Sequence, residues 1–292
     1  MSAAPAMAPK PRLSAYVLTR NSERYLAEIL DALRQIADEV LVLDSGSSDA
    51  TEAIARAAGA RFVYRAFDSF RRQREFAAAQ CRHDYIFFCD SDEIPDATLI
   101  RSIQVAQQQG LSAAGYTVTR PWIVRGCTVH AIYPVNCPDT VPRMFDRRRC
   151  HWDPAKAVHE TLLVDGPSVH LEGQLRHVTF HSLAEQERKL QSYTDLAAEQ
   201  IVHKLQRRGG LTALRRAELL LKSWVTSPLG AIMKSYIVRG GWRDGRVGVS
   251  LLGYAVRYSS LRYRKAITRM AGSPPPASSP RPTTPAGRAP RE

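Results

Sequence analysis

The N-terminal part of the chain alternates between short β-prone runs and segments with helical periodicity. The runs Val40-Leu41-Val42-Leu43 and Tyr85-Ile86-Phe87-Phe88-Cys89 are too short for helices and are typical of strands buried on both faces. The predicted strands are Leu13–Leu18, Glu39–Leu43, Arg61–Tyr64 and Tyr85–Cys89. The predicted helices between them are one carrying Leu26, Ile29, Leu30 and Leu33, then Ala50–Ala58 and Phe70–Gln80. Strands and helices that alternate in this way indicate parallel βαβ units, so we predict an α/β fold with a doubly wound sheet.

Capping signals flank the second of these helices. Asp49, with Glu52 three residues later, has the pattern of a capping box. Gly59 is the residue type that most often ends a helix. We therefore predict that Asp49 caps the start of this helix and that Gly59 ends it.

The strand Tyr85–Cys89 is followed at once by two carboxylates, Asp90 and Asp92. Open α/β sheets bind ligands at the carboxyl ends of their strands, and carboxylate oxygens are the donors that Mg²⁺ or Mn²⁺ prefers. Asp and Ser also favour turns that cap a following helix, so an Asp-x-Asp pair alone does not distinguish the two roles. Its place at the end of a buried strand favours a metal site.

Composition narrows the possible classes of protein. The 292 residues suffice for one large domain, or for one domain with an extension. No stretch approaches the roughly 20 apolar residues of a membrane-spanning helix, and the Ala- and Pro-rich start has no apolar signal-peptide core. Five cysteines, an odd number without a C-x-x-C pair, argue against a disulfide framework or zinc knuckle and suit a reducing cytosol.

The chain is strongly basic. Forty-one Lys and Arg against 28 Asp and Glu give a formal charge of +13, which favours anionic partners such as nucleic acid, anionic lipid or phosphorylated substrates. The sequence has no RNA-binding sheet signature, zinc finger or helix-turn-helix pattern. We therefore do not expect nucleic acid as a partner.

The second half of the chain begins with a looser pattern and becomes helical. Strands are expected at Tyr116–Thr119, Thr128–Ile132 and Val169–Leu171, and helices at Leu183–Leu205 and Leu211–Val225. A third helix has an arginine-rich flank and an apolar stripe of Val247, Leu251, Tyr254, Tyr258 and Leu261. Such a stripe lies on an anionic membrane or packs on the α/β domain, and the net charge favours the membrane.

Four regions follow from these patterns. Residues 1–12 and the Pro-, Ser- and Ala-rich residues 271–292 are expected to be disordered tails. Residues 13–181 form the α/β domain, and residues 182–270 form a basic, helical, membrane-proximal region.

Three motifs in order on this chain resemble those of the family 2 glycosyltransferases of the GT-A fold. They are Leu13-Ser14-Ala15-Tyr16-Val17-Leu18-Thr19-Arg20-Asn21, Val42-Leu43-Asp44-Ser45-Gly46-Ser47-Ser48-Asp49-Ala50-Thr51 and Phe87-Phe88-Cys89-Asp90-Ser91-Asp92-Glu93. They are similar in particular to the lipopolysaccharide-core β-glucosyltransferase-like branch, which carries D-S-G-S-x-D and D-A-D-E at these places. The resemblance includes Val158-His159-Glu160, Leu175-Arg176-His177, Lys189 with Tyr193, and Gly241-Trp242-Arg243-Asp244-Gly245. Two positions depart from it: Ser22, where the family usually has Glu, and Glu75, where Asn commonly follows the arginine.

The resemblance implies a GT-A fold with a divalent metal, Mg²⁺ or Mn²⁺, at the end of the fourth strand. Asp92 is implied as the direct metal ligand, and Asp90 as a contact of the ribose or of the same metal. His177 is implied as a further ligand, although a lone histidine is as well explained by a structural role.

The resemblance also implies three residues that bind the nucleotide-sugar donor: Asn21, Asp44 and Arg74. Asp44 matches a carboxylate that accepts the uracil N–H, a charge-assisted hydrogen bond, with a strand-end turn as the alternative. Arg74 corresponds to an arginine near the base or diphosphate, where a planar guanidinium suits phosphate. Arg71 and Arg72 are expected to be solvated.

Glu160 is implied as the base that takes the proton from the acceptor hydroxyl, with Asp139 and Asp165 in reserve. One carboxylate base without a second carboxylate as nucleophile implies inversion of the anomeric centre. Arg143 is expected to bind a phosphate or to form a surface ion pair.

We therefore expect an inverting transferase that moves a hexose, glucose from a UDP-sugar, to a lipid-linked saccharide such as lipopolysaccharide inner core. It is expected at the cytoplasmic face of the inner membrane, bound peripherally to anionic lipid. A nucleotidyltransferase would need a Gly-rich phosphate loop, which residues 19–22 lack. An inactive scaffold of an envelope assembly complex is the other alternative, and the retained acidic residues count against it.

Overall fold

The computed structural model of the protein describes residues 11–153 and 161–271. Nearly all of both predicted tails lie outside these residues. The predicted base, Glu160, lies outside them as well.

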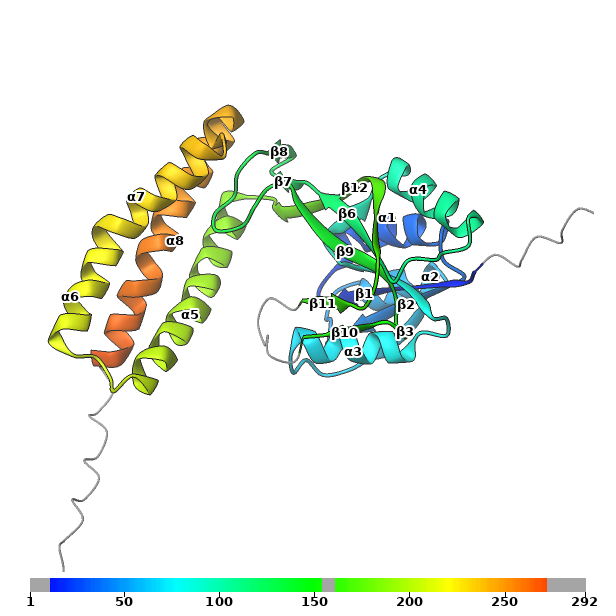
Figure 1. Cartoon of the computed structure of the whole chain (residues 1–292), viewed down its shortest axis with the longest axis horizontal. Coiled ribbons are helices and arrows are strands. Elements are labelled where there is room, and N and C mark those ends of the chain that lie inside the picture. The colour runs from blue at the N-terminus through cyan, green and yellow to red at the C-terminus, as the bar shows by residue number, and fades with distance from the viewer. Residues whose placement is uncertain (1–10, 154–160, 272–292) are drawn as a thin grey trace, which may run out of the picture.

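A ten-stranded mixed sheet forms the centre of the α/β part (Figure 1). Its parallel half has the order β3-β2-β1-β4, with β1 (Leu13–Thr19), β2 (Glu39–Asp44), β3 (Arg61–Tyr64) and β4 (Tyr85–Asp90). The order continues through β9 (Asp139–Asp146), β6 (Gly115–Arg120), β12 (Ser168–Phe180), β7 (Trp122–Val124) and β8 (Cys127–Val129), and β9 is antiparallel to β4 and β6. Off this path, β5 (Glu93–Pro95) pairs with β12, and β10 (Cys150–Trp152) pairs with β11 (Leu162–Val164). The predicted doubly wound, mixed sheet is confirmed.

Helices cover both faces of the parallel half, because alternate strand residues point to opposite faces. The helices are α1 (Glu23–Leu33), α2 (Thr51–Ala57), α3 (Phe70–Gln80) and α4 (Ala97–Gln108). Val17 and Phe87 pack in the core beneath α1, α2 and α4. Tyr16 and Phe88 belong to the opposite core, beneath α3 and the β10–β11 pair.

The start of α2 differs from the prediction. Its N-cap residue is Ala50, which makes no side-chain cap. Asp49 instead accepts hydrogen bonds from the backbone N–H groups of Glu23 and Thr51, each at 3.1 Å, and Glu52 pairs with Arg56. The predicted capping box is therefore wrong, because Asp49 joins the starts of α1 and α2 instead of closing on Glu52.

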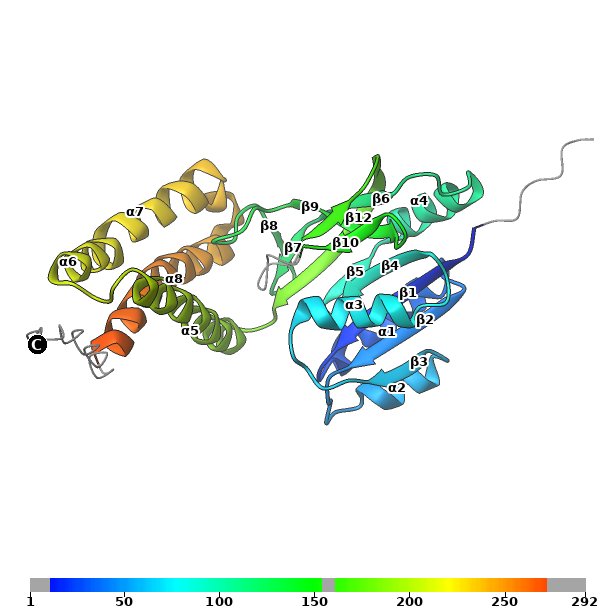
Figure 2. The same cartoon turned by 60° about the horizontal axis from the view of Figure 1, so that its bottom comes forward.

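The predicted helical extension is also present, as three long helices side by side (Figure 2). They are α5 (Leu183–Arg207), a continuous helix over residues 213–238 and α8 (Gly245–Ala271). The continuous helix consists of α6 (Ala213–Leu221), a π-helical segment (Lys222–Thr226), α7 (Ser227–Ala231) and a second π-helical segment (Ile232–Val238). A 3₁₀ turn, Gly241–Asp244, leads into α8, which lies between the other two helices.

The apolar stripe of α8 is buried within the protein. Leu251 and Tyr254 are 3% and 5% exposed and pack with Val124, Phe180 and Leu190. The prediction that this stripe lies on a membrane is wrong, because it joins α5 to the β7–β8 end of the sheet. Within the described ranges, none of the helices combines the length and apolar character that crossing a bilayer requires.

Candidate active site

Three of the predicted acidic residues lie at one rim of the sheet. In the register of the parallel strands, Asp44 stands opposite Thr19, and Asp90 stands opposite Leu18. Both carboxylates are therefore at the carboxyl ends of the strands that flank β1, and Asp92 follows in the loop after β4. This is the edge at which open α/β sheets bind ligands.

Asp44 is 3% exposed, and its carboxylate organises the loop after β2. It accepts hydrogen bonds from the Gly46 and Ser47 N–H groups at 2.8 Å, from Ser47 Oγ at 2.5 Å and from Thr19 Oγ1 at 2.9 Å. Burial opposes its ionisation, but the hydrogen bonds from Ser47, Gly46 and Thr19 outweigh that effect and lower the pKa of Asp44. Since a carboxylate has about four acceptor sites, a nucleobase would have to replace one of these donors. The nucleobase role of Asp44 stays a prediction.

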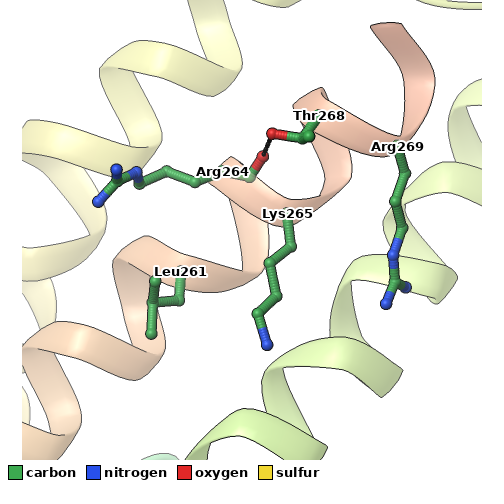
Figure 3. A pocket seen from close by; sticks show the side chains of 5 residues that line it. All are labelled: Leu261, Arg264, Lys265, Thr268 and Arg269. Carbon is green, nitrogen blue, oxygen red and sulfur yellow. Dashed lines mark hydrogen bonds between the residues drawn. The ribbon is translucent and has the colours of Figure 1, made fainter. Parts of the chain in front are cut away.

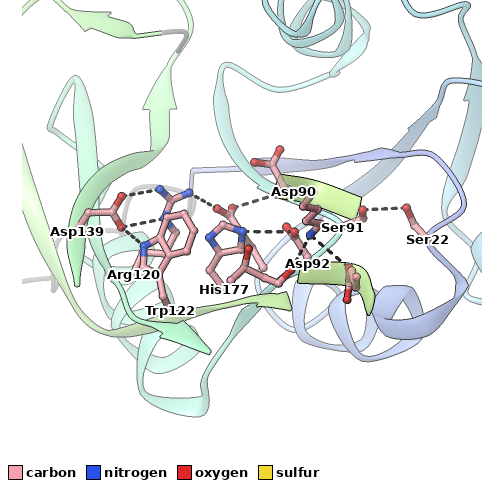
Figure 4. A network of polar contacts seen from close by, with 12 residues as sticks. Ser22, Asp90, Ser91, Asp92, Arg120, Trp122, Asp139 and His177 are labelled. Atoms are coloured by element: carbon pink, nitrogen blue, oxygen red, sulfur yellow. Dashed lines mark hydrogen bonds and ion pairs between the residues drawn. The ribbon is translucent and has the colours of Figure 1, made fainter. Parts of the chain in front are cut away.

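The loop after β1 is tied to its neighbours by polar side chains. Asn21 has a φ of +51°, and its Oδ1 accepts the N–H of Ser48 at 2.8 Å. Ser22, at the position where Glu was expected, donates its hydroxyl to Ser91 at 2.8 Å (Figure 4). The next residue, Glu23, accepts the N–H of Ala50 at the start of α2 at 3.1 Å.

Arg74 and Asp90 form an ion pair at the rim. Arg74 Nη2 lies 2.8 and 3.1 Å from the two carboxylate oxygens of Asp90, and the guanidinium carbon is 5.1 Å from the centre of the Phe88 ring. Arg74 is 7% exposed, whereas the Asp90 side chain is 32% exposed. The structure thus brings these two predicted donor-binding residues together and leaves the carboxylate accessible.

Glu93 is completely buried beneath the rim and holds it in place. Its Oε1 accepts hydrogen bonds from Arg120 and Arg143, both at 2.6 Å, and its Oε2 accepts from Arg143 Nε at 2.9 Å and from the Asp90 N–H at 3.1 Å. Burial opposes ionisation, but the charges of Arg143 and Arg120 outweigh it and hold the pKa of Glu93 well below its ordinary value. Arg143 was expected to bind phosphate or to form a surface ion pair; it lies in a buried ion pair, 7% exposed.

Asp92 and His177 face one another (Figure 4). They come together because β5 pairs with β12 and sets Glu93 opposite His177. His177 Nε2 is 3.3 Å from Asp92 Oδ2, and the Trp122 ring packs on the imidazole at a centroid distance of 4.2 Å. Burial of each group disfavours its charged form, but their mutual attraction raises the pKa of His177 and lowers that of Asp92.

The Asp92–His177 pair fits a divalent cation. Two neighbouring ligands of an octahedral ion, with bonds of about 2.1 Å, lie about 3 Å apart, close to the observed 3.3 Å between carboxylate oxygen and imidazole nitrogen. The Asp92 side chain is 35% exposed, so an ion has access. Among residues 11–153 and 161–271, no three His, Cys, Asp or Glu side chains gather into a closed metal cluster. Mg²⁺ is usually held by one or two protein carboxylates, with its remaining ligands from substrate phosphates and water.

Helix α5 passes beside Asp92 and carries Lys189 and Tyr193, two residues that belong to the family resemblance. Burial and the nearby charge of Asp92 raise the pKa of Tyr193. Lys189 Nζ donates to the Thr179 carbonyl at 2.6 Å and lies 3.4 Å from Glu185. Helix α5 therefore brings a tyrosine and a lysine into the neighbourhood of the Asp92 carboxylate.

The two reserve bases are placed differently. Asp139 lies beside the site but is held by Arg120 at 2.5 and 2.9 Å and by Trp122 Nε1 at 3.4 Å (Figure 4). Asp165 follows β11 and precedes the start of β12, whereas His177 is near the other end of that long strand. The structure therefore does not bring Asp165 to the site, and Asp139 has its oxygens engaged.

Two residues that build the rim were not predicted from the sequence. Glu93 directly follows the recognised Asp-Ser-Asp and could have been found from that motif. No sequence pattern indicated Arg120, because the segment around it has no clear periodicity. Its ion pair with Glu93 depends on the arrangement of distant strands.

Comparisons with known proteins agree with this architecture. The model of Glycosyl transferase family 2 matches residues 14–125, which include the rim residues from Asn21 to Arg120. The lipopolysaccharide core biosynthesis glycosyltransferase LpsC of Rhizobium meliloti is 28% identical over 273 residues, 91% of this chain and 95% of its own. An uncharacterized glycosyltransferase of Rickettsia bellii is 35% identical over 82 residues, 28% of each chain.

Solved structures match part of the chain as well. One of them is glucosyl-3-phosphoglycerate synthase from Mycobacterium tuberculosis in complex with Mn²⁺, uridine diphosphate and glucosyl-3-phosphoglycerate. The match has 25% identity and a TM-score of 0.33, and it spans 39% of this chain and 44% of that one.

The family match, the full-length relative and the acidic rim of the sheet point the same way. Residues 14–125 match Glycosyl transferase family 2, the chain is similar over nearly its whole length to a lipopolysaccharide core glycosyltransferase, and both comparisons support an enzyme that transfers a sugar.

Proposed function

We propose that the protein transfers a hexose, with glucose from UDP-glucose as the expected donor, to a sugar hydroxyl of a lipid-linked acceptor such as lipopolysaccharide inner core. The observation that carries this proposal is the Asp92–His177 pair beside the Asp90–Arg74 pair at the carboxyl rim of the sheet. The name of the full-length relative supports the class of acceptor.

The mechanism follows from the charges at the rim. Asp92 and His177 would hold Mg²⁺ or Mn²⁺, which as a Lewis acid supplies positive charge for the leaving diphosphate. Arg74 orients Asp90 and adds a fixed guanidinium close to the same place. Glu160 would accept the proton of the attacking hydroxyl. Attack in a single displacement inverts the anomeric carbon, so an α-linked donor gives a β-linked product.

We further place the enzyme at the cytoplasmic face of the inner membrane, as a peripheral protein. The formal charge of +13 supports attraction to an anionic leaflet. A lipid-linked acceptor would then be presented to the site from that surface.

A panel of UDP-, GDP- and dTDP-sugars tests the donor class, with slow hydrolysis as the readout. We expect turnover of UDP-sugars in the presence of Mn²⁺ and its loss with EDTA, because an ion held by Asp92 and His177 would supply the positive charge that the leaving diphosphate needs. Turnover that EDTA leaves unchanged would contradict the metal assignment. A preference for GDP- or dTDP-sugars would contradict the donor.

The substitution Glu160→Gln tests the proposed base. It is expected to lower sugar transfer by about 10²–10⁴-fold, the usual contribution of a general base, while the affinity for UDP stays nearly unchanged. Calorimetric titration with UDP separates binding from turnover. Glu172→Gln, a change at an exposed carboxylate of β12, is the control and should keep the wild-type rate. A fully active Glu160→Gln enzyme would assign the base to another residue.

A further inference from the structure

The continuous helix over residues 213–238 exposes its large apolar side chains. A row of them recurs every four residues along its outer side. The row consists of Leu221 (54% exposed), Val225 (43%), Leu229 (56%), Met233 (52%) and Ile237 (52%). A helix that covers a protein core normally buries such residues.

Beyond Leu219, which is buried, the same helix buries small and polar residues instead. Ser223 is fully buried, Ala231 is 1% exposed and Ser235 is 5% exposed. Ser223 Oγ donates to the carbonyl of Ser260 on α8 at 3.3 Å. From Ser223 onward, the helix is therefore attached to α8 through hydroxyl and methyl groups, and its row of large apolar side chains faces away from the protein.

The two π-helical segments keep the outer row straight. Residues four apart on an α-helix are offset by about 40° around its axis, because one turn takes 3.6 residues. The wider turns of a π-helix offset them in the opposite sense. Alternation of α and π segments between Ala213 and Val238 thus holds a row of period four on one side.

The surroundings of this row are basic and carry tryptophan. Residues 211–249 contain seven Lys and Arg but only Glu218 and Asp244 as acids. Glu218 pairs with Lys222, and the Asp244 side chain is 2% exposed and bonded to His130. Both acids are thus paired, so this part of the described surface presents no unpaired negative charge that would repel an anion.

Two exposed tryptophans accompany the row, Trp224 at 62% and Trp242 at 60% exposure. Arg264 reaches from α8 toward the outer helix and stacks on Trp224 at 4.9 Å (Figure 3). Lys265 and Arg269, which line the same hollow of α8, turn instead toward α5 and pair with Asp195. Arginine beside exposed indole is a combination that suits the boundary between water and lipid, where tryptophan places its apolar body and its N–H.

We propose that this outer face, formed by Leu221, Trp224, Val225, Leu229, Met233 and Ile237 with Trp242, docks on the surface of an anionic lipid bilayer. The helix lies in the plane of the interface with its apolar side immersed, and the flanking Lys and Arg contact headgroups. The docking face is thus on the outer helix, and not on the buried stripe of α8. The inference deepens the proposed function, since it names the surface that meets the membrane of a lipid-linked acceptor.

Co-sedimentation of the full chain with vesicles tests the outer face. The wild type is expected to bind phosphatidylcholine vesicles that contain phosphatidylglycerol, with a blue shift of tryptophan emission. Leu229→Ser combined with Met233→Ser should weaken this binding at least about tenfold, because two large apolar side chains no longer enter the lipid. Val105→Ser, at an apolar residue of α4 with 48% exposure, is the matched control and should bind like the wild type.

The basic surroundings are tested separately. Lys234→Glu with Arg243→Glu should weaken binding to anionic vesicles about fivefold or more, and added salt should reduce wild-type binding in the same direction. Equal vesicle binding by the Leu229/Met233 double variant and the wild type would overturn the proposal. So would a dimer of the wild type, found without lipid by analytical ultracentrifugation and lost in that variant, because the face would then bind a second copy.

UDP-sugar hydrolysis without lipid keeps this proposal distinct from the proposed function. The variants of the outer face should retain wild-type hydrolysis, which also shows that they fold. If no UDP-sugar is hydrolysed by any of these proteins while vesicle binding behaves as expected, the donor proposal fails and the docking face stands.

Discussion

Asp92→Asn is expected to reduce UDP-sugar turnover by about 10³-fold, which is the scale of losing a group that stabilises charge on the leaving oxygen. The change keeps the size of the side chain but removes the anionic oxygen that lies 3.3 Å from His177 Nε2. An amide is a far weaker ligand for a hard cation than a carboxylate. Excess Mn²⁺ should therefore restore only a part of the rate, and titration with Mn²⁺ and UDP should show weakened metal binding.

Asp84→Asn is the matched control for this experiment. Asp84 precedes the opposite end of the same strand, where it pairs with Arg147 and Arg148 at a side-chain exposure of 42%. Loss of such exposed pairs has little effect on stability, and turnover should remain at the wild-type level. Full turnover by Asp92→Asn would show that the metal, if one is used, is held elsewhere.

Local patterns predict the N-terminal half of the fold best. The four parallel strands and the helices between them were predicted because each strand is a short apolar run and each helix has its own periodicity. The Thr128–Ile132 prediction was less accurate: the strand is β8 (Cys127–Val129). The expected Val169–Leu171 strand is a small part of the long β12 (Ser168–Phe180). Pairing with distant strands sets the lengths of these elements, and a local window does not contain that information.

The apolar stripes of the helical extension show the same limit. Periodicity identified the stripe of α8, but periodicity cannot distinguish a membrane from the β7–β8 end of the sheet as its partner. The sequence of the outer helix does not predict its exposed row when α-helical periodicity is assumed throughout. The row from Leu221 to Ile237 depends on two π-helical segments. Only the structure shows that the stripe of α8 is covered and that the apolar row of the outer helix is exposed.

The site was predictable to the extent that its residues follow strand ends. Asp90 and Asp92 were proposed in this way, whereas Asp44 and His177 were proposed through resemblance. The buried cluster around Glu93 was not, because its partners Arg120 and Arg143 come from strands that the linear pattern does not connect. A substitution in that cluster is expected to have the second large effect, on both stability and turnover.

Glu93→Gln is expected to destabilise the fold by about 3–5 kcal/mol, the effect of leaving a buried charge without its partner. Glu93 is fully buried and its carboxylate faces both Arg120 and Arg143 at 2.6 Å, so a neutral amide leaves two guanidinium groups with too little negative charge. Turnover should fall as well, because Glu93 Oε2 accepts the Asp90 N–H and thereby holds the turn that carries Asp92. Urea unfolding measures the first effect and UDP-sugar hydrolysis the second.

A double-mutant cycle with Arg143 distinguishes this electrostatic role from simple loss of packing. In the wild type, Arg143→Met removes one of the two cations that face Glu93 and should destabilise the fold. In the Glu93→Gln background, the same substitution removes an uncompensated positive charge, so it should destabilise the fold much less or should stabilise it. Coupling between contacting residues of this kind is typically about 0.5–3 kcal/mol. Glu75→Gln, at an exposed partner of Arg71, is the control and should change stability by less than about 0.5 kcal/mol. Strictly additive effects of the two substitutions would mean that Glu93 contributes through its shape alone, and the fixed charges beneath the rim would then have no part in holding the turn that carries Asp92.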